Sequence, residues 1–259
     1  MRLKSQGAVA AIAPGLGFLA ALLLIVEAMS RAGMVNRVFV PAPSTVLQEV
    51  YGLIASGSFA EPLLQTLGTF FTGYFIGCGI ALALGLLMGT SRAAYALLEP
   101  LTEFLRATPK PALLPPLMLL LGLGASMKLT IVALAALFPV LVSTVQGVRG
   151  VDRVLLDTGR TFGFSRGQTI RRIVLPAALP HILAGMRVSL GIALVVVVLS
   201  EMLAGTGGLG DQLVSMQRSF RLTQTFAWLV IVAVIGLCLT WVFAWVERSL
   251  LFWHAPIAR

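Results

Sequence analysis

Long apolar runs separated by short polar segments restrict the fold of this 259-residue chain more than any other feature. An α-helix needs about 20 apolar residues to cross the hydrocarbon core of a bilayer, and a helix pairs all of its backbone groups internally. Candidate spans lie at about residues 10–29, 64–89, 112–124, 128–146, 183–204 and 226–246, and the third is short and broken by prolines. The sequence therefore predicts an all-α polytopic membrane protein with about six transmembrane helices in one domain, residues 1–259.

The composition favours a membrane protein over a soluble one. Hydrophobic residues make up 58% of the chain and charged residues 11%, whereas about a quarter of a soluble domain is charged. The two cysteines, Cys78 and Cys238, lie inside separate apolar runs. We interpret them as small core residues, since neither a disulfide nor a metal site is indicated by that placement.

The distribution of lysine and arginine predicts which side of the membrane each loop occupies. Six spans put both ends of the chain on one side. Placing both termini in the cytoplasm leaves only five of the 19 basic residues outside, namely Arg31, Arg37, Lys128, Arg218 and Arg221. The positive-inside rule expects this asymmetry, so the net charge of +9 follows from topology and no nucleic-acid partner is predicted. The first run is long for a signal peptide and lacks a clear cleavage site, so we interpret it as an uncleaved span.

A polar loop at about residues 147–182 separates the fourth and fifth spans. Residues that recur at helical spacing predict a short amphipathic helix with Asp157 on another side; they are Val151, Val154, Leu155, Thr158 and Phe162. Gly163 is placed to end this helix in a left-handed conformation. Ser165 and Gln168 form a capping box that begins a second helix. That second helix is expected to stop at two prolines, Pro176 and Pro180.

The spacing within this loop follows a known pattern. Asp157, Thr158 and Gly159 are followed after three residues by Gly163, and after nine more by Ile173, Val174, Leu175 and Pro176. This spacing resembles the cytoplasmic EAA loop of binding-protein-dependent ABC importer permeases. The resemblance implies a type I ABC importer permease fold with a cytoplasmic coupling helix. It assigns ATPase coupling to Asp157, Thr158, Gly159, Phe162, Gly163, Ile173, Leu175 and Pro176.

The loop departs from that pattern at its opening residues. Aspartate replaces glutamate and keeps the charge, whereas Thr158 and Gly159 replace two alanines. A glycine weakens a helix by up to about 1 kcal/mol relative to alanine.

A second segment is similar, without a gap, to permeases of the nitrate, sulfonate and taurine type. The matching residues are Leu105, Arg106, Pro109, Ala112, Pro115, Gly122, Gly124 and Lys128. Such permeases commonly carry an acid at the position of Ala125 and bulky aromatic residues at those of Leu120 and Leu121.

The family resemblance implies a larger assembly in a bacterial inner membrane. It contains two copies of the permease as a homodimer, two ABC ATPase subunits and a periplasmic or extracellular substrate-binding protein. ATP and magnesium are expected in the ATPase, because this chain has no G-x-x-x-x-G-K-[ST] loop and no cofactor of its own is predicted. The expected activity is passage of a small solute into the cytoplasm by alternating access. The subgroup favours an organic or inorganic anion, such as a sulfonate, taurine or a nitrate-like compound.

The path of the solute is predicted less directly. Pro109, Pro115 and Pro116 interrupt the short third run, and interrupted helices leave backbone groups free to line a polar cavity. The alternative is a kinked helix packed against its neighbours. Glu201 is an ionisable residue at membrane depth, so it is a candidate gate. Its alternative is an ion pair with an outer basic residue, Arg218 or Arg221.

Enzyme and ion-coupled alternatives fit the sequence less well. Residues 163–167 spell G-x-S-x-G, but a hydrolase elbow needs a preceding strand and a later acid, and here a helix precedes. His181 and His254 lie far apart, so no metal site is predicted. An ion-coupled secondary transporter would also be polytopic, but no clear internal repeat is found. The permease interpretation predicts a non-catalytic chain.

Overall fold

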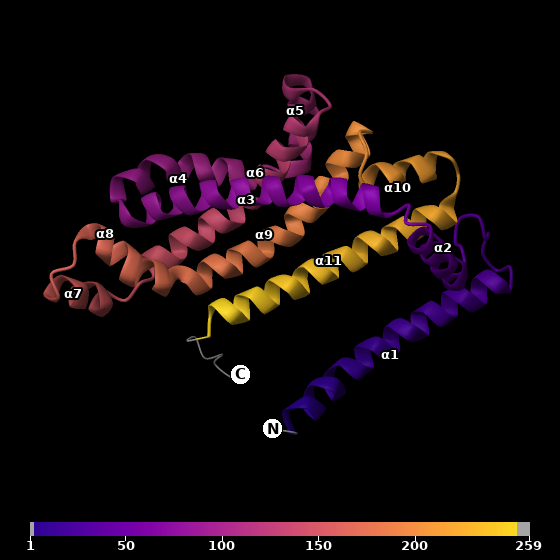
Figure 1. Ribbon diagram of the computed structural model, residues 1–259, viewed down its shortest axis with the longest axis horizontal. Coiled ribbons are helices and arrows are strands. Elements are labelled where there is room, and N and C mark those ends of the chain that lie inside the picture. The colour runs from indigo at the N-terminus through magenta and orange to yellow at the C-terminus, as the bar shows by residue number, and fades with distance from the viewer. Residues whose placement is uncertain (1–2, 253–259) are drawn as a thin grey trace. The chain divides into compact units, whose positions relative to one another are not determined.

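The computed structural model describes residues 3–252. Every regular element within that range is a helix (Figure 1), which confirms the all-α prediction. The elements are α1 (Leu3–Arg31), α2 (Pro43–Ala55), α3 (Ala60–Thr90), α4 (Arg92–Ala107), η1 (Lys110–Leu113), α5 (Leu114–Leu121), α6 (Ala125–Arg149), α7 (Arg153–Thr161), α8 (Arg166–Thr169), η2 (Ile170–Val174), α9 (Leu175–Ala204), α10 (Leu209–Arg218) and α11 (Leu222–Leu250).

Four of the predicted spans coincide with helices that are long and apolar enough to cross a membrane. These helices cover Ala60–Thr90, Ala125–Arg149, Arg166–Ala204 and Leu222–Leu250. The short third run forms a shorter apolar helix at Lys110–Leu121. The first run falls within α1, whose side chains lie outside the described set at residues 3–13 and 16. The total of six spans therefore stays a prediction.

The chain divides into two compact units. The first contains residues 1–60 and 212–232, and the second contains residues 61–211 and 233–259. In the first unit, α2 begins with Pro43 in its first turn, where the missing proline N–H costs no helical hydrogen bond. The side chain of Glu27 accepts hydrogen bonds from the Ser44 amide (3.0 Å) and hydroxyl (2.7 Å), which joins α1 to the start of α2. The single-domain organisation stays a prediction.

The second unit is built around α6, which packs closely against α3 and α9 (Figure 1). Glycines make the approach to α3 possible. A Cβ added to Gly77 would lie 2.3 Å from the carbonyl oxygen of Ala133, and one added to Gly85 would lie 2.6 Å from the side chain of Thr144. Small residues let two membrane helices approach at backbone distance. On α9, Gly185 plays the same part, since its Cβ would lie 2.6 Å from Ser143 of α6.

Helix α4 was not predicted. It occupies the segment between the second and third apolar runs. The helix is amphipathic, with charged residues on one side and apolar residues on the other, so it contains no continuous apolar run that would predict a span. Ser91 begins the helix by accepting a hydrogen bond from the Ala94 amide at 3.2 Å. The guanidinium of Arg149, at the end of α6, lies 4.0 Å from the ring centre of Tyr95 on α4. This contact holds the start of α4 against the end of α6.

The expectation that Pro176 and Pro180 stop the second loop helix is wrong. The helix that begins at Arg166 continues to Ala204, with Pro176 in the first turn of α9 and Pro180 inside it. A π-helical turn, η2, precedes Pro176, and the Leu175 amide donates to the carbonyl of Ile170 five residues earlier. Such a wider turn changes the hydrogen-bond register, which accommodates a residue that has no N–H to donate.

Candidate coupling site

The predicted loop helix exists as α7, and its two ends are fixed by local hydrogen bonds. Asp152 precedes the helix and its side chain accepts a hydrogen bond from the Val154 amide at 2.9 Å. At the other end Gly163 has φ of 70°, as predicted. The Gly163 amide donates to the carbonyl of Arg160 and the Phe164 amide donates to that of Gly159, both at 2.9 Å. This pair of bonds is the Schellman arrangement, which a left-handed glycine permits.

The capping box at Ser165 is confirmed. The Ser165 hydroxyl accepts from the Gln168 amide at 3.3 Å, and the Gln168 side chain accepts from the Ser165 amide at 2.8 Å. The serine of the G-x-S-x-G sequence thus serves the start of α8, after a helix and a turn. Among the described residues before Ser165 there is no strand, so this serine does not have the geometry of a nucleophile elbow.

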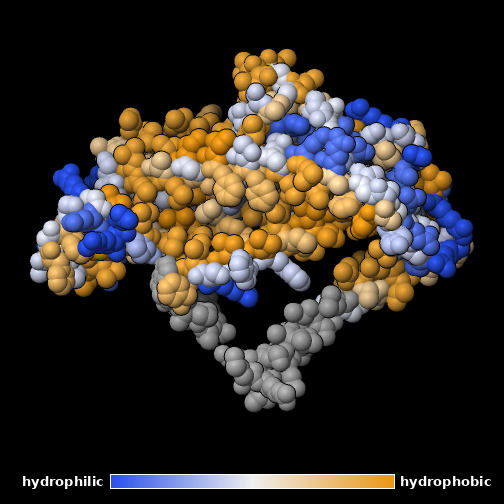
Figure 2. All heavy atoms as spheres, in the orientation of Figure 1, coloured by the Kyte–Doolittle hydropathy of each residue, from blue (hydrophilic) through white to orange (hydrophobic). Residues whose placement is uncertain are grey.

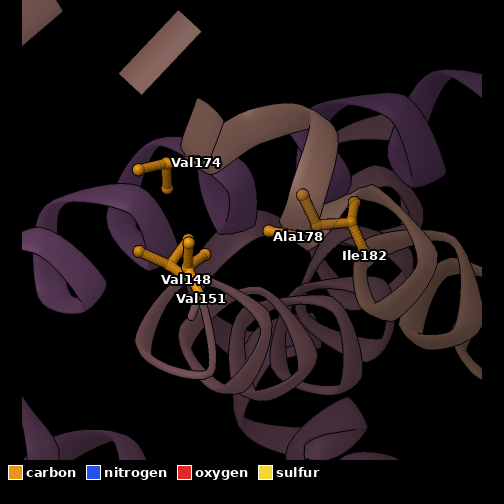
Figure 3. Close-up of a cluster of buried hydrophobic side chains, with 5 residues drawn as sticks. All are labelled: Val148, Val151, Val174, Ala178 and Ile182. Carbon is orange, nitrogen blue, oxygen red and sulfur yellow. The ribbon is translucent and has the colours of Figure 1, made fainter. Parts of the chain in front are cut away.

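One side of α7 is packed inward. Gly159 is buried, and a Cβ at that position would lie 2.5 Å from Cδ1 of Ile173. Ile173, Leu175 and Leu156 pack against a buried cluster formed by Val148, Val151, Val174, Ala178 and Ile182 (Figure 3). The cluster joins the end of α6 to the start of α9. Two residues predicted for coupling, Gly159 and Ile173, are therefore in contact, and a third, Leu175, packs beside them.

The other side of α7 exposes apolar side chains. Val154, Leu155 and Phe162 are 69%, 47% and 74% exposed. Beside them Asp157 pairs with Arg160 at 2.9 Å, with both side chains largely in solvent. The predicted apolar face is therefore divided, because Val151 turns into the buried cluster while Val154, Leu155, Thr158 and Phe162 face outward. We name the exposed residues Val154, Leu155 and Phe162 the α7 apolar face.

The remaining predicted loop residues take defined positions. Thr158 is exposed and its hydroxyl donates to the carbonyl of Val154 at 2.7 Å. Pro176 is exposed at the start of α9. Asp152 and Leu156 were not predicted, although an aspartate directly before a helix is a recognisable capping signal. In the second unit, Figure 2 shows hydrophilic residues gathered at the α7–α8 end and a hydrophobic surface over the long helices.

Glu201, a predicted gate residue, lies in a closed polar cluster. It is completely buried near the end of α9. The Thr66 hydroxyl of α3 lies 2.9 Å from both of its carboxylate oxygens, and the Gly210 amide donates to Oε2 at 3.0 Å. Thr66 in turn accepts a hydrogen bond from the Leu209 amide at 2.9 Å. The hydrogen-bond donors to this carboxylate within the second unit are a hydroxyl and a backbone amide.

A tight glycine turn encloses this carboxylate. Gly205, Gly207 and Gly208 have φ of 61°, 85° and 97°, a region that other residues rarely adopt. A Cβ on Gly208 would lie 2.3 Å from the Glu201 carboxylate. Gly205, Gly207 and Gly210 spell G-x-G-x-x-G, but a long apolar helix precedes them where a dinucleotide-binding loop would follow a strand, so this sequence forms a turn.

The three path prolines occupy the beginnings of short helices. Pro109 precedes η1 in an extended conformation, and Pro115 and Pro116 lie in the first turn of α5. At these positions a proline removes no helical hydrogen bond. The segment is therefore interrupted between α4 and α5, and no long kinked helix forms here. Within residues 3–252, no group of three or more histidine, cysteine, aspartate or glutamate side chains could hold a metal ion.

These features define a class: a helical multi-pass membrane protein whose polar loop is structured and presents an apolar face. The chain belongs to the family of binding-protein-dependent transport system inner membrane components, which matches residues 76–252. It is 33% identical over 93% of its length to Bacillus subtilis SsuC, provisionally named an aliphatic sulfonates transport permease protein, and covers 87% of that protein. It is 28% identical to the Escherichia coli taurine transport system permease protein TauC, over 93% of this chain and 90% of that one.

A solved structure shows the same fold. A chain of the MetNI methionine ABC transporter, in an inward-facing conformation, aligns with a TM-score of 0.62 at 20% identity. The alignment covers 71% of this chain and 92% of that one. The chain is thus a non-catalytic permease subunit of an ABC importer in the inner membrane, and the family implies an ATPase and a substrate-binding protein as partners. This membership favours neither a membrane hydrolase nor an ion-coupled carrier.

Proposed function

We propose that the chain passes a small anion from an external binding protein into the cytoplasm by alternating access, driven by ATPase subunits that dock on the loop at about residues 147–182. The proposed docking residues are Asp157, Thr158, Gly159, Phe162, Gly163, Ile173, Leu175 and Pro176. Two ATPases serve two copies of the permease, which form a homodimer, and both termini lie in the cytoplasm. ATP and magnesium bind to the ATPase.

The observation that carries this proposal is the α7 apolar face. Val154 and Leu155 are exposed on a helix of nine residues that is fixed at both ends by hydrogen bonds, and Phe162 is exposed directly after it. Exposed apolar groups on an otherwise polar loop mark a surface that another protein covers. The buried contacts of the same helix, through Gly159 and Ile173, are separate from this face. Docking on one side therefore leaves the packing on the other side intact.

A rigid helix is also what force transmission requires. When a partner moves α7, the contact between Gly159 and Ile173 moves η2, and η2 continues without a break into α9. A permease that alternates between two states needs such an element, whose contacts with the partner differ between the states.

The anionic substrate is proposed from the related proteins. The names of the relatives refer to aliphatic sulfonates, taurine and, for a Synechocystis protein 27% identical over 80% of this chain, nitrate. These solutes share a compact oxyanion. A sulfonate, taurine or a nitrate-like compound is accordingly the expected class for this chain.

Co-purification tests the docking surface. The tagged chain is purified from its native membrane in a mild detergent, and the amount of P-loop ATPase per permease is measured by mass spectrometry. Phe162→Ala is expected to lower that ratio at least about tenfold, because buried aromatic residues dominate interface energies. The same substitution leaves α7 folded, since the side chain is 74% exposed.

The matched control is Phe104→Ala on α4, where the phenylalanine is 72% exposed. It should retain the ATPase at the wild-type ratio. Equal retention by wild type and Phe162→Ala would contradict the role of the α7 apolar face. Absence of any ATPase with the wild-type chain would contradict the proposed function itself.

A further inference from the structure

A pocket of about 400 Å³ lies in the second unit, between the α4–η1 segment and the pair formed by α6 and α9. It has the size of a small-molecule site. Its polar lining includes Arg106, Lys110 and Ser143, and its apolar lining includes Phe138, Val188 and Ile192. None of the residues that line it is acidic.

The ammonium group of Lys110 gives the pocket a fixed positive charge. It donates hydrogen bonds to the carbonyls of Thr108 (2.9 Å) and Leu105, and lies 4.2 Å from the ring centre of Phe138. Among the ion pairs of the described chain, none involves Lys110. Carbonyl groups orient this cation without neutralising it, so its charge is available to an anion.

Arg106 and Ser143 supply further donors. Arg106 pairs with Glu103 at 2.6 Å, but both side chains are about half exposed, so water weakens the pair and an anion in the pocket can compete for the guanidinium. The Ser143 hydroxyl is half-buried, and within residues 3–252 it makes no hydrogen bond. Two cations and one free hydroxyl therefore line a single pocket.

The apolar part of the lining restricts the ligand further. Val188 and Ile192 stand on α9, and Phe138 stands on α6. An inorganic ion such as nitrate would leave these side chains without a partner. A ligand with an ammonium group, such as taurine, would bring a positive charge to a pocket that already holds two and has no carboxylate. An anion with a short apolar tail matches both parts.

The depth of the pocket suits a transport path. Ser143 and Ala135, which both line it, lie six and 14 residues before Arg149, the last residue of α6. At 1.5 Å per residue these positions are about 9 and 21 Å from that end of the helix. With Arg149 at the cytoplasmic edge, as the distribution of basic residues predicts, the α6 wall of the pocket extends from near that edge past the middle of a bilayer about 30 Å thick, where transporters hold their substrates.

We propose that this pocket binds an organic oxyanion with a short apolar tail, a sulfonate or carboxylate, as it passes through the permease. The charged head lies at Lys110, Arg106 and Ser143, and the tail lies along Val188 and Ile192. The inference rests on the proposed function, in which the chain carries small anions. Within that class it predicts that an organic anion with a short apolar tail binds more tightly than nitrate or taurine.

Thiol chemistry tests the charge of the pocket. Ser143→Cys is made together with Cys238→Ser, since Cys238 is exposed and Cys78 is buried. The permease–ATPase complex is placed in lipid nanodiscs and treated with sulfonatoethyl or trimethylammonioethyl methanethiosulfonate. Each rate is divided by the rate of that reagent with free cysteine. We expect the anionic reagent to be favoured at least about tenfold, because a fixed cation attracts it and repels the other.

Two variants show where this preference comes from. Lys110→Gln should reduce the preference for the anionic reagent at least about threefold. Arg92→Gln is the matched control, because Arg92 is an exposed basic residue at the start of α4, outside the pocket, and it should leave the ratio unchanged. Equal rates for the two reagents, or an equal effect of both variants, would overturn the anion site.

Protection experiments test the tail. Butanesulfonate should slow labelling of the cysteine at concentrations about tenfold lower than nitrate or taurine require, and equal protection by either would overturn the apolar-tail assignment. ATPase content is measured in the same preparation. Its absence contradicts the proposed function, whereas its presence together with equal reagent rates contradicts only the pocket.

Discussion

The contact between Gly159 and Ile173 explains why the loop carries a glycine where the EAA pattern has alanine, and it can be tested by exchanging volume between the two positions. An alanine at position 159 would gain up to about 1 kcal/mol of helix stability. However, its Cβ would lie 2.5 Å from Cδ1 of Ile173, well inside the usual carbon–carbon contact of about 3.5–4.0 Å. Ile173 must therefore rotate away from its preferred position.

The two effects are similar in size. Cδ1 is the end of a flexible side chain, so the movement costs about 1 kcal/mol, which is typical of a strained rotamer. We expect Gly159→Ala alone to be nearly neutral. Ile173→Val removes the obstructing methyl group and costs about 0.5–1.5 kcal/mol. In that background Gly159→Ala should show its full gain of about 1 kcal/mol, because the new methyl group fills the vacated space.

Hydrogen exchange measures this locally. The amides of Gly163 and Phe164 are bonded to the carbonyls of Arg160 and Gly159, so their exchange reports opening of the end of α7. In the Ile173→Val background, Gly159→Ala should slow exchange about fivefold, and with Ile173 retained it should change exchange less than about twofold. The four chains are compared at equal detergent and pH. The same slowing in both backgrounds would show that Ile173 does not restrict residue 159.

Three further predictions concern the second unit, each measured as thermal unfolding of the purified chain in detergent. Glu201→Gln should lose about 1–3 kcal/mol, because it puts an NH2 donor in place of one carboxylate oxygen in a fully buried cluster where the Thr66 hydroxyl and the Gly210 amide already donate to this side chain. Thr66→Val should lose a similar amount and Thr66→Ser much less. An unchanged Glu201→Gln would refute the cluster. Gly208→Ala should lower the stability far more than Gly205→Ala, since the added Cβ would lie 2.3 Å from Glu201 in the first case and 3.9 Å from its nearest neighbour in the second. Equal losses of stability would mean that the cost comes from the positive φ of both residues and not from the contact with Glu201. Tyr74→Phe should cost about 1 kcal/mol of stability, because it removes the 2.7 Å hydrogen bond from the Tyr74 hydroxyl of α3 to the Met186 carbonyl of α9. A variant as stable as wild type would show that this bond does not stabilise the fold.

The parts of the loop that could be predicted from sequence depend on neighbouring residues. The left-handed turn at Gly163 and the capping box of Ser165 and Gln168 each involve a few consecutive positions, so their residue types determine the geometry. The length of an apolar run similarly predicts a span from local composition alone. These features required no knowledge of the tertiary structure.

The parts that failed depend on distant contacts. Thr66 is 135 positions from Glu201, and no local pattern joins a buried carboxylate to a threonine of another helix. The division of the apolar residues of α7 into a buried and an exposed set likewise depends on η2, which folds back beneath Gly159. One signal was readable, since Gly73 and Gly77 have the four-residue spacing at which membrane helices pack closely, and both approach α6.

The proposed coupling loop and the proposed anion pocket both involve α6 and α9, so no long internal pathway between them is needed. Helices α6 and α9 both line the pocket, and the cluster of Val148, Val174 and Ala178 joins the same two helices beside α7. Close contacts at Gly147 and Gly185 leave little room for α9 to slide along α6. A displacement of α7 is therefore expected to move both walls of the pocket together. The α4–η1 segment, which carries Arg106 and Lys110, contacts α6 through Lys110 and the ring of Phe138. We expect a displacement that breaks this contact to open the proposed pocket and release its anion.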